Sequence, residues 1–365
     1  MPPAFPSFLL IHTYHPDFLR RVYRDHPDLA AQPFDLQRRR LFDTGYCLAD
    51  AYGASLRALG CPAEEIIVNA DPLQRCWAKE HGLTPEGNVH DRRRSIVEAQ
   101  IRTLRPEVLY VFEWCPLGDA FLKDMRRYVR LLVGQVASPL VAGRTYEAYD
   151  LMLSSWPPLV EHFRRAGLRT EHFRLGFDQR VLDRLPDTEV DLPVSFVGGF
   201  APSHPDRIAW LERLCREIEL TVFGYGIETV PESSPLRRRH QGPVWGYEMY
   251  RVLRRSRVTL NRHAQIPVGG RVCAAFANNM RLYEATGVGT CLLTERRTNL
   301  PSLFEPDREV LTYADDAECL EKVRWALEHP EAAREIARRG QHRTLHEHTY
   351  RHRMIELLDR IRRHL

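Results

Sequence analysis

The chain has 365 residues, 44% of them hydrophobic, which is typical of two globular domains with ordinary cores. Its formal net charge of +4 is small for this length, so it does not indicate a protein dedicated to binding nucleic acid. The basic runs at residues 91–94, at 237–240 and near the C-terminus are typical of solvated helix faces and loops. Peripheral contact with an acidic lipid surface is the minority interpretation of these runs.

The eight cysteines include no Cys-x2-Cys spacing, so a zinc signature is absent and they are typical of buried, reduced thiols. No charged N-terminal region leads into a long apolar stretch, which argues against a signal peptide. No window approaches the roughly 18–20 uncharged apolar residues that a transmembrane helix needs. We therefore expect a cytoplasmic protein without a transmembrane segment.

Short apolar runs alternate with amphipathic stretches through the first half of the chain. The predicted strands are residues 7–12, 108–112, 130–135 and 151–154. The predicted helices are residues 41–59, 92–104 and 120–128, and one that runs through Phe163 and is capped by Gly167. Strands that alternate with helices indicate βαβ units and a parallel sheet.

Asp, Pro and Thr accumulate around residues 183–193, which predicts a linker, and a second α/β series follows it. Its predicted strands are residues 194–198, 220–224, 258–260 and 290–294, and its predicted helices are 206–217, 247–255, a short one with Arg281 and Glu284, 317–328 and 332–339. We therefore predict an α/β protein with two doubly wound domains that face one another across a cleft. Ligands of such sheets bind beyond the carboxyl ends of the strands.

Residues 279–295 are the most informative stretch. Arg281 and Glu284 lie three apart, so they share one face of a helix that would end at Gly287 or Gly289. Such a pair suits a nucleotide-sugar donor, because Arg281 could pair with a phosphate and Glu284 could accept hydrogen bonds from the ribose diol. An ion pair on a solvated helix face is the alternative, and the two residues alone would favour it.

Motifs in both halves carry a family resemblance. In the first half they are residues 69–80, 104–110, 134–139, 149–155 and 176–178, and in the second half 196–199, 260–263, 279–284 and 348–353. In their order and spacing the chain resembles the CgeB-like, or spore maturation protein-like, glycosyltransferases. These belong with the group 1 glycosyltransferases of the GT-B fold.

The resemblance implies two Rossmann-like domains, with the acceptor bound by residues 1–185 and the nucleotide-sugar donor by residues 191–345. It also implies that a helix within residues 346–365 packs back on the first domain. Related enzymes carry two glutamates eight residues apart near the donor. The second matches Glu284, but Phe276 stands at the position of the first, so a retaining or inverting outcome does not carry over.

For the donor diphosphate, Gly198 and Gly199 follow a strand and could offer backbone N–H groups, and Arg207 in the next helix could clamp a phosphate. A plain strand-to-helix turn is the alternative. Asn261 and His263 follow another strand, where polar side chains are expected to point into the cleft. We also assign Asn279 to the donor, although capping of the next helix would explain it equally.

Glu113 is the first choice for a general base, because it directly follows the predicted strand 108–112 and burial beside Trp114 would raise its pKa. His12 and His15 follow the first strand in the same way, although single histidines are more often structural.

Two further assignments follow from the same pattern. Gln135 and Ser138 are predicted to contact the acceptor. Asp315 and Asp316 precede a helix and are interpreted as its N-terminal cap, and we predict no essential metal and no cofactor.

Our first hypothesis is a glycosyltransferase that moves a sugar from a nucleotide-diphosphate sugar to a glycan, protein or small-molecule acceptor. The second is a non-catalytic nucleotide-sugar or glycan-binding protein of a surface or spore-coat assembly, which the departure at Phe276 motivates. The third is another nucleotide-dependent enzyme on the same fold, such as a sugar epimerase.

Overall fold

The computed structural model describes residues 5–112, 116–200, 205–268 and 271–365. Contacts within the chain divide it into two compact units, Met1–Arg174 with Arg351–Leu365 and Leu175–Tyr350. Residues 175–185, which the sequence placed in the first domain, pack in the second unit, where Phe177 and Val181 are buried in the core. None of the described helices is both long and apolar enough to cross a membrane.

The first unit is built on a six-stranded parallel sheet of order β2-β1-β3-β4-β5-β6. Its strands are β1 Phe8–His12, β2 Ala63–Ile67, β3 Val108–Phe112, β4 Leu131–Gln135, β5 Leu151–Ser154 and β6 Thr170–His172. Its helices are α1 Pro16–Asp25, α2 Phe34–Phe42, α3 Ala51–Ala58, α4 Asp71–Glu80, α5 Val89–Leu104, α6 Asp119–Met125, α7 Pro157–Arg165 and α15 Tyr350–Arg362, with short 3-10 turns η1 Pro27–Ala31 and η2 Arg126–Tyr128.

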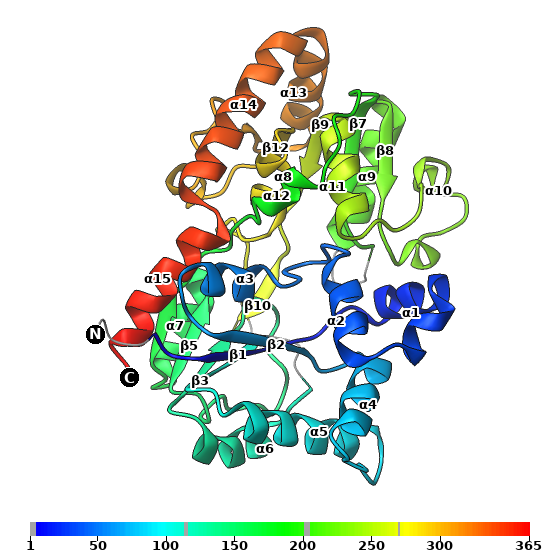
Figure 1. Ribbon diagram of the computed structural model, residues 1–365. Coiled ribbons are helices and arrows are strands. Elements are labelled where there is room, and N and C mark those ends of the chain that lie inside the picture. The colour runs from blue at the N-terminus through cyan, green and yellow to red at the C-terminus, as the bar shows by residue number, and fades with distance from the viewer. Residues whose placement is uncertain (1–4, 113–115, 201–204, 269–270) are drawn as a thin grey trace. The chain divides into compact units, whose positions relative to one another are not determined.

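Alternate residues of β1 serve the two faces of this sheet, as expected for a strand buried on both sides. Leu9 and Ile11 pack against Val97 of α5 and Leu122 of α6. Figure 1 shows α5 and α6 below the sheet and α3 above it. The side chains that face α3 include polar ones, among them Glu65 of β2.

One predicted helix was wrong. Residues 41–59 form the end of α2, a turn and then α3. The helix is interrupted because Gly45, Cys47 and Ala49 all have positive φ angles, of 65°, 50° and 40°. Cysteine and alanine rarely adopt this left-handed conformation, so nothing in the residue types announces the break.

The second unit has a five-stranded parallel sheet of order β13-β12-β9-β7-β8. Its strands are β7 Leu192–Val197, β8 Leu220–Phe223, β9 Ser256–Asn261, β12 Cys291–Glu295 and β13 Leu311–Tyr313, beside a separate hairpin of β10 Ile266–Val268 and β11 Arg271–Cys273. Its helices are α8 Arg180–Asp183, α9 Pro205–Glu217, α10 Pro235–Arg239, α11 Tyr247–Arg255, α12 Arg281–Gly287, α13 Asp316–Glu328 and α14 Pro330–Glu347, with 3-10 turns η3 Ile227–Thr229 and η4 Leu300–Ser302.

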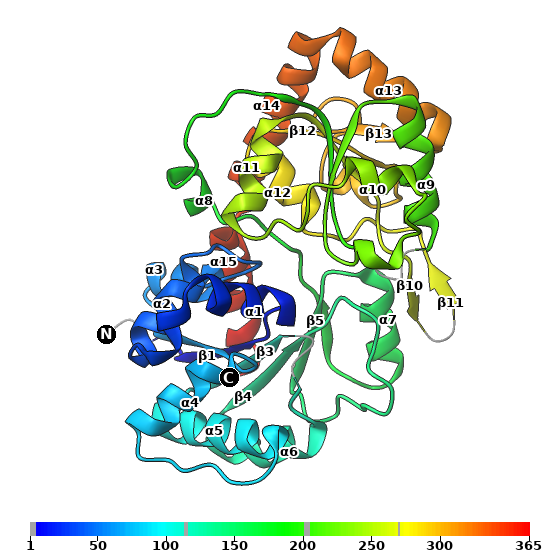
Figure 2. The same cartoon turned by 90° about the vertical axis from the view of Figure 1, so that its right-hand side faces the viewer.

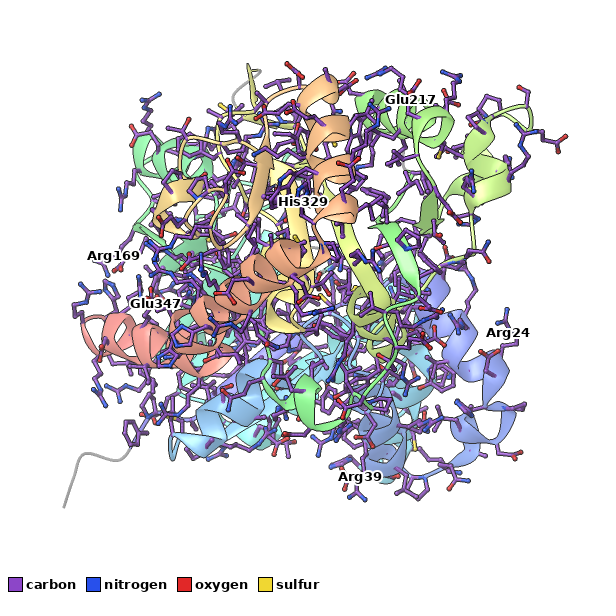
Figure 3. All side chains as sticks on the ribbon, turned by 90° about the horizontal axis from the view of Figure 1, so that it is seen from above. Arg24, Arg39, Arg169, Glu217, His329 and Glu347 are labelled. Atoms are coloured by element: carbon purple, nitrogen blue, oxygen red, sulfur yellow. The ribbon has the colours of Figure 1, made fainter. Side chains whose placement is uncertain are left out.

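Helices cover both faces of this sheet. Trp210 of α9 and Val323 of α13 belong to one core cluster, and Leu253 of α11 and Leu282 of α12 belong to another. Figure 2 shows these two helix pairs on opposite sides of the strands. In Figure 3, His329 and Glu347 mark the two ends of α14.

The cap predicted at Asp315 is confirmed. Asp315 is the N-cap of α13, and its Oδ1 accepts a hydrogen bond from the Glu318 N–H at 2.9 Å. Asp316 lies in the first turn and pairs instead with Arg213 of α9.

The chain passes between the units twice, at neighbouring points of the second unit. The Phe177 N–H donates to the His348 carbonyl at 2.8 Å, and the Tyr350 N–H donates to the Phe177 carbonyl at 2.9 Å. From there α15 packs within the first unit, where Met354, Leu357 and Ile361 are fully buried.

Candidate functional site

A pocket of about 190 Å³ opens in the second unit at the carboxyl ends of β7 and β9. These strands are neighbours although β8 lies between them in the sequence, so the strand order reverses here. In open α/β sheets, ligands bind in the crevice at such a reversal. The lining comes from the two strand ends, α9 and the start of α12, namely Phe196, Val197, Gly198, Arg207, Asn261, Arg262, Asn279, Met280, Arg281 and Glu284.

Arg207 reaches the pocket from the first turn of α9. It donates to two neutral partners, from Nη1 to the Gly199 carbonyl at 3.0 Å and from Nη2 to the Arg262 carbonyl at 3.3 Å. Its Nε is buried and has no hydrogen-bond partner among the described residues. Burial lowers the pKa of this guanidinium to about 10, so it remains a cation at neutral pH. A buried cation with an unused N–H is suited to a phosphate oxygen.

Arg281 and Glu284 form an ion pair of 2.9 Å between Nη1 and Oε2, one turn apart on α12. Their side chains are only 13% and 8% exposed, so the alternative of a pair on a solvated face does not describe them. Arg281 also donates from Nη2 to the Val197 carbonyl at 3.2 Å, while its Nε is buried without a partner among the described residues. Burial raises the pKa of Glu284, and Arg281 opposes this shift.

The helix itself ends as predicted. α12 stops at Gly287, and Gly289 takes a left-handed φ of 79° just beyond it.

Asn279 is not a helix cap, since Met280 holds the N-cap position of α12. Its Nδ2 instead donates to Oδ1 of Asn261 at 2.7 Å, and Asn261 in turn donates to Oγ1 of Thr294 at 2.8 Å. The Oδ1 of Asn279 is buried without a partner among the described residues. The two amides therefore present an unused acceptor beside the two arginines.

His263 lies behind these amides, fully enclosed. Its backbone N–H donates to Oε2 of Glu295 at 2.7 Å, and its Nε2 lies 3.2 Å from Oγ1 of Thr294. Burial, helped by the nearby Arg297 and Arg207, lowers the pKa of the imidazole to about 3. His263 is therefore neutral at physiological pH and supports the pocket through hydrogen bonds.

This neutral histidine makes a prediction about stability. Below its ordinary pKa of 6.5 the unfolded chain takes up a proton that the folded protein excludes until about pH 3, so the free energy of unfolding falls as pH falls. Between pH 7.5 and 5 the expected loss from this one group is about 2 kcal/mol. Urea denaturation at both pH values measures this loss of unfolding free energy. In His263→Gln the loss between the two pH values should be smaller than in the wild-type protein by about 2 kcal/mol. The exposed His329→Gln should match the wild-type loss, and an unchanged difference in His263→Gln would contradict the assignment.

Gly198 and Gly199 allow close packing at the end of β7. The Gly198 N–H donates to the Phe223 carbonyl of β8 at 2.9 Å, so it is already used in the sheet and is not available to a phosphate. A β-carbon on Gly199 would lie 2.7 Å from the ring of Tyr225. Gly198 lines the pocket and Gly199 follows it in the chain, and the structure gives both glycines a steric role.

In the first unit, the strand order reverses between β1 and β3, where His12 ends β1. His12 is buried, and its Nε2 lies 2.5 Å from Oε2 of Glu65. The other carboxylate oxygen of Glu65 accepts the Gly53 N–H of α3 at 2.8 Å. The ring of His12 stacks on Phe112 with centroids 4.3 Å apart. Nothing in the sequence pattern singled out Glu65 as its partner.

The other residues predicted for the first unit have different surroundings. His15 is the N-cap of α1 and accepts the Asp17 N–H at 3.2 Å through Nδ1. Gln135 is buried, and its Oε1 accepts hydrogen bonds from Tyr110 at 2.5 Å and Tyr52 at 3.3 Å. Ser138 is half-buried in the loop after β4. Glu113 lies outside the described residues.

Two methionines are among the residues at this pocket that the sequence analysis did not predict. Met249 of α11 places its sulfur 3.2 Å from Nη1 of Arg281, and Met280 lines the pocket directly. Methionine is a common core residue, so the sequence pattern did not single out either residue as part of a binding site. Within the described ranges, no group of three His, Cys, Asp or Glu side chains is placed to hold a metal ion.

The overall architecture is that of the GT-B glycosyltransferases, two parallel-sheet α/β domains in one chain. A glycosyltransferase from Rickettsia africae superposes with a TM-score of 0.60 at 8% identity, covering 99% of this chain and 98% of that one. Sucrose-phosphate synthase from Thermosynechococcus elongatus gives 0.59 at 15% identity, covering 98% of each chain. Anabaena Alr3699/HepE, in complex with UDP-glucose, gives 0.57 at 12% identity, covering 98% of this chain and 100% of that one.

In sequence, residues 207–359 match a family described as glycosyl transferase-like. No protein of curated function matches the chain.

Proposed function

We propose that this protein is a glycosyltransferase that moves a sugar from a nucleotide-diphosphate sugar to an acceptor. The observation that carries the proposal is the pocket at the β7–β9 reversal, where two buried guanidinium groups and a buried carboxylate converge. The glycosyl transferase-like match begins at Arg207 and includes Arg281 and Glu284. We further propose membership of the group 1 enzymes and, within them, the CgeB-like subfamily.

The two arginines would stabilise the leaving diphosphate. Cleavage of the bond from the anomeric carbon leaves negative charge on the β-phosphate, and preorganised cations lower the energy of that charge in a dry site. Arg207 and Arg281 are each held by backbone carbonyls, from Gly199 and Val197, and each keeps an unpaired Nε. Because these cations supply the positive charge, we propose that the reaction needs no metal.

Glu284 would hold the ribose. A carboxylate offers two acceptor oxygens, which suits a vicinal diol with two donors. The ion pair of 2.9 Å between Nη1 of Arg281 and Oε2 of Glu284 keeps the carboxylate in place. The Oδ1 of Asn279 offers a further acceptor for a sugar hydroxyl.

We propose that the first unit binds the acceptor and that His12 is its general base. If Nε2 of His12 donates to Glu65 at 2.5 Å, Nδ1 carries the lone pair that accepts a proton. Glu65 then fixes the tautomer and stabilises the imidazolium that forms. Glu113 and His15 stay as alternative bases and Gln135 and Ser138 as acceptor contacts, although Oε1 of Gln135 is already bonded to two phenols.

The acceptor is proposed only by class: a glycan, a protein or a small molecule. The cysteines of the described residues are free thiols, which supports our proposal that the reaction takes place in the reducing cytoplasm. The alternative function, a non-catalytic nucleotide-sugar or glycan-binding protein, is favoured by Phe276 at the position of the first glutamate of related enzymes.

The test is a thermal-shift panel of nucleoside diphosphates and their sugars, followed by donor hydrolysis and transfer assays. UDP-sugars come first because a neighbour of the same fold was solved with UDP-glucose. A ligand at a hundred times its dissociation constant stabilises the folded protein by about 2.7 kcal/mol, which a melt detects. A selective shift with turnover supports the transferase, and a shift without turnover supports a nucleotide-sugar-binding protein. No shift from folded protein contradicts both of these and leaves the glycan-binding alternative.

Arg207→Gln tests the diphosphate assignment separately. We expect it to weaken binding of nucleoside diphosphates by about tenfold to a hundredfold, since a charge-assisted hydrogen bond contributes about 1.5–3 kcal/mol. Affinity for the free nucleoside should be unchanged. Arg216→Gln, on the exposed side of the same helix, is the matched control. Equal loss for nucleoside and diphosphate would contradict a phosphate contact.

A further inference from the structure

Two aromatic side chains stack beside the pocket without a role in the function described so far. Tyr225 follows β8 and Trp245 precedes α11, and their rings lie 5.2 Å apart between centroids at an angle of 12°. Tyr225 is 36% exposed and is the only exposed Phe, Tyr or Trp among the described residues. A flat aromatic surface open to solvent costs free energy, and it is typical of a surface that binds another flat group.

The pair adjoins the donor pocket through Gly199. A β-carbon there would lie 2.7 Å from Cζ of Tyr225, so the ring rests directly against this glycine. The carbonyl of the same residue accepts the hydrogen bond from Arg207. Gly199 therefore contacts both the ring of Tyr225 and the Arg207 guanidinium that we assign to the diphosphate.

Trp245 is connected to the pocket through α11. It lies just before Gly246, the N-cap of α11, whose φ of 54° and ψ of −128° suit only glycine. One turn into that helix, Met249 contacts Arg281 at 3.2 Å. The ends of β7 and β8, the start of α11 and α12 thus form one continuous wall that carries both the aromatic pair and the pocket residues.

The close approach of the strand ends depends on a third glycine. A β-carbon on Gly224 would lie 1.8 Å from the carbonyl oxygen of Gly198. The glycines at positions 199 and 224 therefore let the end of β8 place Tyr225 against the end of β7.

We propose that Tyr225 and Trp245 bind the nucleobase of the donor by stacking. This inference rests on the proposed function and names the subsite that recognises the base. Stacking uses the π-face that every base has, so it tolerates different bases. We therefore expect the donor site to select for a nucleotide over a base-free phosphate more strongly than it selects one base over another.

The experiment compares Tyr225→Ala and Trp245→Ala with wild type, using UDP, GDP and ADP as ligands and pyrophosphate and ribose 5-phosphate as base-free controls. Each alanine variant should weaken nucleotide binding by about 5- to 150-fold, the range that base–aromatic stacking contributes. Affinity for the base-free ligands should be unchanged. Tyr225→Phe and Trp245→Phe, which keep a ring, should stay within about threefold of wild type and cover the case in which an alanine variant fails to fold.

A second readout uses wild-type protein. A base stacked on Trp245 should quench its fluorescence, so nucleotides should quench the emission, pyrophosphate should not, and the difference should vanish in Trp245→Phe. Folded alanine variants with wild-type nucleotide affinity would overturn the proposal, as would equal losses for nucleotides and pyrophosphate. Failure of wild-type protein to bind any nucleotide would instead overturn the proposed function, so the two failures are distinguishable.

Discussion

Replacing Glu284 by alanine is expected to remove discrimination for the ribose of the donor. Wild-type protein should bind UDP more tightly than its 2′,3′-dideoxy analogue by about 10- to 150-fold, because a hydrogen bond to a charged group contributes about 1.5–3 kcal/mol. In Glu284→Ala, the affinity for UDP should fall by the same factor, so that UDP and the dideoxy analogue bind equally tightly. Titration calorimetry with the two ligands on the two proteins measures the coupling directly.

The same substitution should also destabilise the protein. It leaves Arg281 buried without its carboxylate, and removing one partner of a buried pair costs about 3–5 kcal/mol. Binding must therefore be measured well below the melting temperature, with the folded fraction checked by circular dichroism. Glu284→Gln keeps the volume and one acceptor oxygen, and Glu328→Ala on the exposed end of α13 is the matched control. A folded Glu284→Ala that still prefers UDP would contradict the ribose assignment.

Gly224→Ala is expected to lower the free energy of unfolding by about 2–3 kcal/mol or more. Its new methyl group would lie 1.8 Å from the Gly198 carbonyl oxygen, and a backbone atom cannot turn aside as a side chain can. Relief requires the ends of β7 and β8 to separate, which weakens the bond from the Gly198 N–H to the Phe223 carbonyl. For a unit of this size the melting temperature should fall by roughly 5–10 °C.

A matched glycine in the first unit separates this clash from a general effect of alanine. At Gly118 the new methyl group would lie 3.5 Å from Nη2 of Arg94, an ordinary contact, and φ is −75°. Gly118→Ala should therefore change stability by less than about 1 kcal/mol, a loss that helix capping alone would explain. Equal losses from the two substitutions in urea denaturation would contradict a steric origin at Gly224.

The regular elements were predictable because their patterns are strong. The buried runs that became β3 and β5, and the amphipathic run that became α11, have the predicted bounds. The alternation of these elements is enough to predict two doubly wound sheets. A polar residue after a strand is then expected at the ligand-binding edge without further information, which is why Asn261 and His263 were assigned to the same site.

What was missed depends on contacts rather than on pattern. The break between α2 and α3 uses Cys47 and Ala49 in a conformation that their side chains disfavour, so tertiary packing decides it. Strand β2 carries Glu64 and Glu65 in its centre, and the carboxylate of Glu65 is accommodated only because His12 and Gly53 satisfy it. Whether Asn279 caps a helix or bonds to Asn261 cannot be read from either residue alone.

The return of the chain to the first unit constrains how the protein can be made. The first unit contains the N-terminal residues but also Arg351–Leu365, so the ribosome has finished the whole second unit before the last piece of the first is available. Met354, Leu357 and Ile361 are fully buried in the finished unit. During synthesis, the apolar surface of the first unit that these residues cover therefore stays exposed until residues 351–365 are made. The second unit is synthesised later than the first sheet but can complete its fold earlier.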